Sequence, residues 1–134
     1  MIVDTSALIA IARGEPEAGV FAAILSEADD TRISAGSMLE AGLVIDGFGD
    51  PVLNREFETV LQSAQLTIEP FSASQAELAR QAYRDFGKGS GHPAGLNFGD
   101  CFAYALAFES GEPLLFKGQD FVHTGIAVAY DSQA

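Results

Sequence analysis

The chain has 134 residues, 48% of them hydrophobic, which is enough to form one globular domain over residues 1–134 without stabilising disulfides. Nineteen acidic residues oppose seven basic ones, and the net charge of −12 works against non-specific binding to nucleic acids. The single cysteine, Cys101, excludes an intrachain disulfide, and no apolar run reaches the ~18 residues of a membrane span, so we expect a cytoplasmic protein without membrane association.

Strand and helix patterns alternate along the chain. Ile2–Val3 predicts a short buried strand, and the Asp-Thr-Ser that follows it predicts a turn into a helix. Further elements are expected, in chain order, as a helix at Pro16–Glu27, a strand at Thr31–Ser34, helices at Ala35–Asp46 and Val52–Gln62, a strand at Leu66–Ile68, helices at Ser74–Phe86 and Phe98–Glu109, and strands at Leu114–Phe116 and Ile126–Ala129. This order predicts an α/β fold with a mostly parallel central sheet covered by helices.

Two acidic residues interrupt otherwise core-like helices. Glu40 is the only charged residue from Ser34 to Ile45, and Asp100 is the only one from Gly95 to Phe108. A carboxylate in apolar surroundings is unfavourable unless something compensates its lost hydration. Neither segment supplies a nearby cation, so the candidate partners are distant basic side chains, backbone donors or a metal ion.

Each acid also has a purely structural interpretation. Asp4 could cap the helix that begins near Ser6. Asp100 could occupy the third position of a helix capped by Asn97, where a carboxylate is favoured by the helix dipole. Glu40 could extend from the edge of its helix into solvent.

The predicted topology brings the acids together. In an open parallel sheet the functional crevice lies outside the carboxyl ends of the strands, where Asp4 and Asp120 both follow a strand. Glu40 and Asp100 could point into the same crevice from helices. Carboxylates gathered in this way repel one another unless a cation holds them ionised, and oxygen-only ligands favour Mg²⁺ or Mn²⁺. Zinc fits less well, because the only histidines, His92 and His123, are not at ligand spacing.

Four segments carry a resemblance to a known family: "MIVDTSAL", "ISAGSMLEAGLVI", "AGLNFGDCFAYALA" and "LLFKGQDF", which together span nearly the whole chain. In this order and spacing they resemble the PIN-domain nucleases, and within them the VapC toxin ribonucleases of bacterial toxin–antitoxin pairs. The resemblance implies a single PIN-like domain, Mg²⁺ or Mn²⁺ held by Asp4, Glu40 and Asp100, an RNA substrate, a homodimer, and a small antitoxin that blocks the site.

One segment departs from the family pattern. Many members have Thr-x-Asp-x-Asp-Phe near the end, and here Phe116 and Gly118 replace the threonine and the first acid. Asp120 keeps the second acid and is therefore the candidate fourth catalytic residue. Thr5 and Ser6 match the family's Asp-Thr-Ser and could orient Asp4 or a metal-bound water.

Basic residues are few but clustered. Arg80, Arg84 and Lys88 recur every four residues on a predicted helix and its exit. Together with Lys117 they are candidates to hold the RNA backbone, although such a run can also be a plain solvated helix face.

The acidic crevice should attract an antitoxin segment that carries Arg or Lys.

Other classes fit the sequence less well. A receiver domain needs paired acids after the first strand and a phosphoacceptor aspartate after the third, and "LTIEPF" has no aspartate. A haloacid-dehalogenase-like phosphatase needs Asp-x-Asp, whereas the chain has Asp4-Thr5-Ser6. A PIN-fold binding module without catalytic activity stays an alternative, because fold does not guarantee activity.

Overall fold

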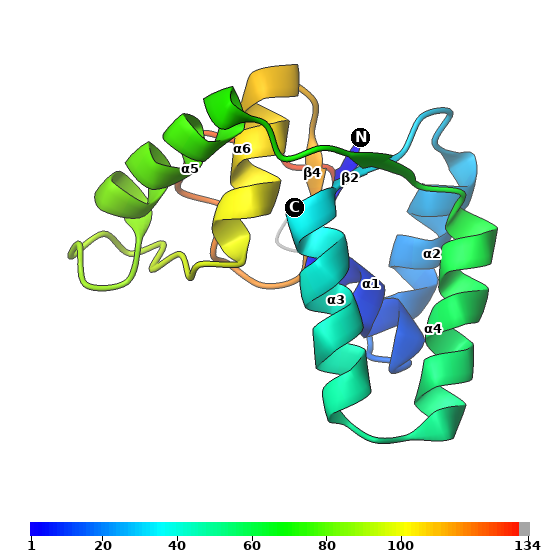
Figure 1. The fold of residues 1–134 in the computed structure, drawn as a ribbon. Coiled ribbons are helices and arrows are strands. Elements are labelled where there is room, and N and C mark those ends of the chain that lie inside the picture. Colours follow the sequence, from blue (N-terminus) through cyan, green and yellow to red (C-terminus); the bar gives the residue numbers. More distant parts are fainter. Residues whose placement is uncertain (132–134) are drawn as a thin grey trace.

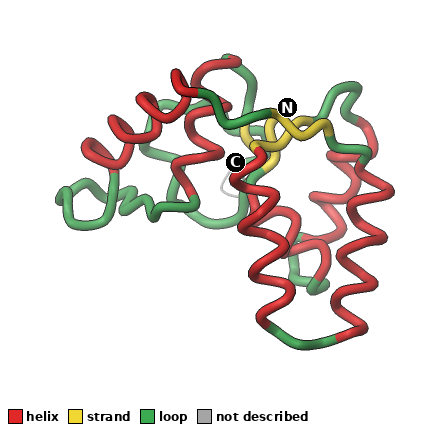
Figure 2. The backbone as a smooth tube through the Cα atoms, viewed as in Figure 1, coloured by secondary structure: helices red, strands yellow, loops and turns green. Residues whose placement is uncertain are grey.

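Four short parallel strands lie between two groups of helices in the computed structural model, which describes residues 1–131 (Figures 1 and 2). The elements are, in chain order, β1 (Ile2–Val3), α1 (Thr5–Ala12), α2 (Ala18–Glu27), β2 (Arg32–Ser34), α3 (Ala35–Gly47), α4 (Pro51–Ala64), β3 (Thr67–Glu69), α5 (Ala73–Phe86), α6 (Asp100–Ser110) and β4 (Leu114–Leu115). The single domain expected over 1–134 includes three residues outside the described range.

The strand order in the sheet is β3-β2-β1-β4, and every named pairing is parallel. Ile2 pairs with Arg32 on one side and with Leu114 on the other. The prediction of a mostly parallel sheet covered by helices is confirmed. Because all four strands run in the same direction, their carboxyl ends lie at one edge of the sheet.

Alternate strand residues face two separate hydrophobic cores. Ile2 and Leu114, both fully buried, pack in one core with Tyr104 and other residues of α6 and α5. Val3 and Leu115, one position further along, pack in a second core built from α1, α2, α3 and α4. Figure 1 shows α5 and α6 on one side of the strands and α1, α2 and α4 on the other. Strands buried on both faces explain why the sequence shows short apolar runs here instead of alternation.

One expected strand is not formed, and most of the expected boundaries differ from the structure by one or two residues. Ile126–Ala129 is not a strand, because it lies beside β4, which is itself two residues long and offers only an isolated parallel bridge between Leu114 and Val128. The helix expected from Pro16 begins at Ala18, after a turn in which the Ala18 N–H donates to the Glu15 carbonyl. The helix expected from Phe98 begins at Asp100.

Among residues 1–131, no helix is both long and apolar enough to cross a bilayer.

Candidate functional site

The acids predicted to form the site line one open pocket at the carboxyl edge of the sheet. Asp4 follows β1, Glu40 lies on the helix that follows β2, Asp100 begins α6, and Asp120 follows β4. The pocket has a volume of about 410 Å³ and is also lined by Thr5, Ser6, Ile9, Glu15, Val44, Asn97 and Lys117. The structure thus brings together all four acids that the sequence singled out.

Asp4 uses only one of its two carboxylate oxygens inside the protein. Its Oδ2 accepts hydrogen bonds from the Ser6 backbone N–H at 3.0 Å and from the Ser6 hydroxyl at 2.6 Å, which makes Asp4 the N-cap of α1. Its Oδ1 is buried and has no hydrogen-bond partner within the described residues. Burial, and then the charges of Asp100 and Glu40, raise the pKa of Asp4 to about 7, against the lowering effect of the Ser6 hydrogen bonds.

Asp100 also has a structural role. Its backbone N–H donates to Asn97 Oδ1 at 2.9 Å, and its Oδ2 accepts from the Asn97 backbone N–H at 3.0 Å, a reciprocal cap at the start of α6. Burial, and then the nearby Asp120 and Glu40, raise the pKa of Asp100 to about 6, while the Asn97 hydrogen bond and Lys88 act in the opposite direction. The capping interpretation and the site interpretation therefore describe the same residue.

Glu40 lies against the backbone next to Asp100. A β-carbon on Gly99 would overlap the Glu40 carboxylate, so only glycine at this position leaves room for it. Glu40 also borders an apolar pocket of about 350 Å³ lined by Gly36, Leu39, Leu43, Val44, Phe98, Gly99 and Phe102. The half-buried Glu40 thus separates the acidic pocket from an apolar surface.

Asp120 is exposed at the pocket and lies near enough to Asp100 to raise the pKa of Asp100. Two residues earlier, Gly118 has a φ of +101°, which an aspartate adopts only with strain. The loop conformation of this chain therefore disfavours the first acid of the family pattern at Gly118.

The two hydroxyl residues after Asp4 lie differently. Ser6 contacts Asp4 directly, and its Oγ also accepts the Lys117 backbone N–H at 2.9 Å. The buried Thr5 hydroxyl donates instead to the Ser37 carbonyl at 2.9 Å and ties α1 to α3. Of the two hydroxyl residues that were expected to orient Asp4, Ser6 therefore forms a hydrogen bond to it and Thr5 does not.

The basic candidates fall into two groups. Arg80, Arg84 and Lys88 are exposed along α5 and its exit, and no ion pair within 4 Å joins them to another side chain of residues 1–131. Lys117 lines the acidic pocket itself, and its Nζ lies 2.5 Å from Glu15 Oε1 and 3.2 Å from Glu17 Oε2. These two acids raise the pKa of Lys117, and the largest contribution is the hydrogen bond that Lys117 donates to Glu15.

The donor set fits a hard divalent ion. Mg²⁺ takes one or two protein carboxylates and keeps several waters, and Asp4 Oδ1 is a buried oxygen that lacks any other partner. Within the described part of the chain, no three Asp, Glu, His or Cys side chains are placed to hold a metal by themselves. An ion bound here would therefore need waters to complete its coordination. His92 Nδ1 is occupied, because it accepts the Ala94 N–H at 3.0 Å.

Two residues near the acids were not predicted from the sequence. Glu15 belongs to the connection between α1 and α2, and nothing local in the sequence marks that connection as adjacent to Asp4. Gly99 could have been recognised, because a glycine directly before the isolated Asp100 is a signal of close packing.

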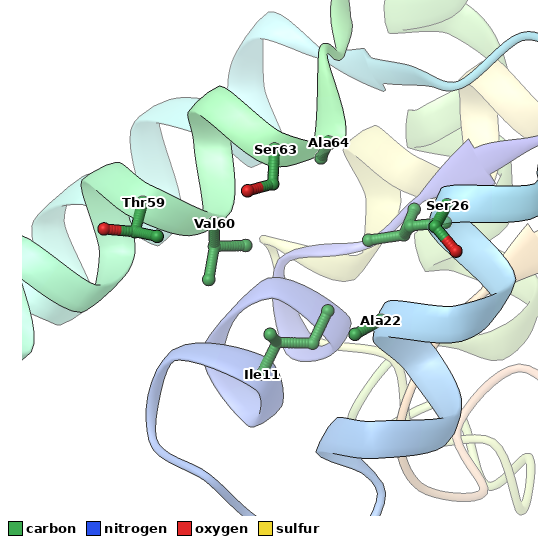
Figure 3. Close-up of a pocket in the computed structure, with 8 residues that line it drawn as sticks. Ile11, Ala22, Ser26, Thr59, Val60, Ser63 and Ala64 are labelled. Atoms are coloured by element: carbon green, nitrogen blue, oxygen red, sulfur yellow. The ribbon is translucent and has the colours of Figure 1, made fainter.

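A second pocket lies away from the acids. It has a volume of about 180 Å³ and lies between α2 and α4, with Ile11 of α1 beneath it (Figure 3). Its lining is apolar apart from three hydroxyl groups and contains no ionisable side chain: Ile11, Ala22, Leu25, Ser26, Thr59, Val60, Ser63 and Ala64. It has no group that could bind a metal or activate water.

Comparisons with known proteins identify relatives of this chain. The sequence model of the PIN domain matches residues 1–127. Ribonuclease VapC28 of Mycobacterium tuberculosis is 56% identical over 131 residues, 98% of each chain, and ribonuclease VapC42 of the same species is 46% identical over 96% of this chain and 98% of its own.

Two solved structures share the fold. VapC20 of Mycobacterium tuberculosis, described as a sarcin-ricin loop cleaving toxin, superposes with a TM-score of 0.70 at 19% identity and covers 97% of this chain and 98% of its own. A toxin–antitoxin complex from Klebsiella pneumoniae gives a TM-score of 0.69 at 19% identity over 96% and 95% of the two chains.

Proposed function

Since this chain belongs to the PIN-domain family, and within it to the VapC ribonucleases, we propose that it is a metal-dependent endoribonuclease that acts as the toxin of a type II toxin–antitoxin pair. The observation that carries the proposal is the buried, unpartnered Oδ1 of Asp4 in a pocket shared with Glu40, Asp100 and Asp120. Burial of a carboxylate oxygen without a hydrogen bond costs free energy unless a ligand binds to that oxygen.

Asp4, Asp100 and Glu40 would hold Mg²⁺ or Mn²⁺, and Asp120 would complete the acidic set at the exposed side of the pocket. When bound, such an ion acidifies a water and offsets the charge of the phosphodiester that is hydrolysed. The chain itself fixes the geometry. Ser6 orients Asp4, the Asn97 cap orients Asp100, and the bare backbone of Gly99 leaves room for Glu40.

RNA would be held by the exposed cations of α5 and its exit. Arg80, Arg84 and Lys88 are free of ion pairs within residues 1–131, and Lys88 lies close enough to Asp100 to lower its pKa. Phosphates could thus be bound along α5 in spite of the net charge of −12. An RNA substrate would place the protein in the cytoplasm.

A homodimer would form through the apolar surface next to the site. Copies with a charge of −12 repel each other, so a stable contact requires a surface with few acids. Leu39, Leu43 and Phe98 are 64%, 62% and 78% exposed and form such a surface on α3 and in front of α6. Leu39→Glu should convert a dimer to a monomer in sedimentation equilibrium, and an unchanged mass would place the dimer contact elsewhere.

The activity is tested by incubating the purified protein with total RNA, with and without Mg²⁺ or Mn²⁺, and mapping the new ends. We expect metal-dependent internal cleavage, lost in Asp4→Asn and in Asp100→Asn while both variants keep the fold. Cleavage at the wild-type rate by either variant would contradict the site. RNA binding without cleavage under any metal would instead identify a PIN-fold binding module.

A further inference from the structure

A lysine side chain lies in the acidic pocket. Among the described residues that line this pocket, Lys117 is the only basic one, beside five carboxylates. Its Nζ is held by Glu15 and Glu17 at 2.5 and 3.2 Å, and no hydrogen bond or ion pair within residues 1–131 joins it to Asp4, Glu40, Asp100 or Asp120. Lys117 therefore does not serve to neutralise these four acids.

The other end of Lys117 is anchored to Asp4. Its backbone N–H donates to Ser6 Oγ at 2.9 Å, and the same Ser6 hydroxyl donates to Asp4 Oδ2 at 2.6 Å. The backbone of Lys117 is thus one side chain away from the Asp4 carboxylate, while two acids restrict its ammonium group. A free lysine side chain has high rotamer entropy, and fixing it at both ends before substrate arrives reduces the entropy that is lost during the reaction.

A phosphate that enters this pocket meets carboxylates on several sides. Charge that develops on its non-bridging oxygens is best stabilised by a donor that is already in place. Lys117 remains charged, because two acidic partners hold its ammonium group. Its side chain is 36% exposed, so the ammonium group can be reached from the pocket.

We propose that Lys117 is a catalytic residue whose ammonium group donates a hydrogen bond to a non-bridging oxygen of the scissile phosphate, and that Glu15 and Glu17 are positioning residues that hold it there. No proton is transferred in this contact. The inference rests on the proposed ribonuclease function, and it concerns the scissile phosphate, whereas the cations of α5 would hold the flanking backbone.

The competing explanation is a structural ion pair that fastens the α1–α2 connection to the loop after β4. The chain offers a matched control for it. Arg13 also pairs with Glu15, at 3.5 Å, but its guanidinium lies over the Phe48 ring, 4.7 Å from the centroid, and it does not line the pocket. Arg13→Ala removes a cation and an ion pair with the same acid without emptying the pocket.

The test compares single-turnover cleavage of one short RNA by wild type, Lys117→Ala, Lys117→Arg, Glu15→Gln/Glu17→Gln and Arg13→Ala, with melting temperatures for all. We expect Lys117→Ala to lower the cleavage rate at saturating RNA by on the order of 100-fold, with little change in RNA affinity, because the contact strengthens in the transition state. Lys117→Arg should recover part of the rate, and added ethylammonium should rescue Lys117→Ala. The double Gln variant should lose rate to a smaller extent, and Arg13→Ala should stay within about twofold of wild type.

The outcomes separate the two proposals. Two results with an active wild type would overturn the role of Lys117 and leave the ribonuclease proposal intact. One is an equal loss of cleavage rate in Lys117→Ala and Arg13→Ala. The other is a loss of cleavage rate that follows the melting temperature and is not rescued by ethylammonium. A wild type that cleaves no RNA under any metal would overturn both.

Discussion

A single side chain at the centre of the site combines two roles that the sequence presented as alternatives. Asp4 caps α1 through Oδ2 and leaves Oδ1 buried without a partner in the described residues. Asp100 also takes part in a cap, since its Oδ2 accepts the Asn97 backbone N–H at the start of α6. Because a cap needs one oxygen and a carboxylate has two, the helix starts can hold the acids in place without consuming them.

The raised pKa of Asp4 predicts a specific pH dependence of stability. Folding raises this pKa from 3.8 to about 7, so between these values the folded chain binds more protons than the unfolded chain, and its stability falls as pH rises. Asp4→Asn keeps the cap but removes this ionisation. In EDTA, the variant should gain stability over wild type as pH rises from about 4 to about 8, approaching roughly 4 kcal/mol.

Urea unfolding at several pH values measures this difference. Saturating Mn²⁺ should reverse its sign, because the ion stabilises the ionised wild-type site and has fewer ligands in the variant. A difference that is independent of pH in EDTA would show that Asp4 is ionised in the metal-free fold.

The second residue-scale prediction concerns Gly99. Gly99→Ala suits its helical backbone, with a φ of −64°, but the new methyl group would overlap the Glu40 carboxylate and displace it. We expect the cleavage rate to fall on the order of 100-fold with little change in melting temperature, since a displacement of about 1 Å in a catalytic group has an effect of this size.

The control for Gly99 lies on the same helix as Glu40. A β-carbon on Gly42 would have no atom within 4 Å, so Gly42→Ala should cleave at the wild-type rate. Equal rates for the two alanine variants would mean that the position of Glu40 is not important for cleavage.

At the scale of the elements, the helices could be predicted from the sequence, whereas the failure of Ile126–Ala129 to form a strand could not. Helical periodicity is a local signal, and the helices predicted at Ala35–Asp46 and Val52–Gln62 are found within a few residues as α3 and α4. The segment Ile126–Ala129 has the composition of a strand. Whether it forms one depends on the length of β4, which is set by tertiary packing and not by local sequence.

The residues of the candidate site also differ in whether local sequence could predict them. Asp4, Glu40 and Asp100 could be identified because each interrupts an apolar segment. Glu15 and Glu17 could not, because they lie in an ordinary acidic connection and reach the pocket only by pairing with Lys117, a hundred or more residues later in the chain. Pairings of that kind depend on the arrangement of distant elements.

The basic face of α5 gives the prediction at this scale. Replacing Arg80, Arg84 and Lys88 together by Ala should lower the slope of log affinity against log salt by roughly 2, at about 0.7 per phosphate contact on single-stranded RNA. Fluorescence anisotropy with labelled RNA in an Asp100→Asn background measures the slope without cleavage. Arg55→Ala, an exposed cation on α4 with no ion pair in residues 1–131, is the control. An unchanged slope would identify the α5 cations as a solvated face.

The whole molecule combines a charge of −12 with one acidic pocket and a neighbouring apolar surface. Long-range attraction therefore favours a basic partner over RNA, and an RNA substrate would rely on local cations and on the proposed metal ion. This balance explains how a nuclease could be inhibited by a small protein. A partner with an arginine in the pocket occupies the same acids that the metal ion requires.

The last prediction follows from that competition. The proposed antitoxin should place a basic segment against Asp4, Glu40, Asp100 and Asp120, because a guanidinium pairs bidentately with carboxylates and opposite charges accelerate encounter. Mn²⁺ affinity measured by calorimetry should then fall when the partner is saturating, and replacing the partner's Arg and Lys residues in this segment by Gln should restore cleavage. Raising the salt concentration should weaken the complex, less so where apolar contacts dominate. If the Mn²⁺ affinity is unaltered and the Gln variant still inhibits, the partner instead covers the surface that binds RNA and does not reach the acids.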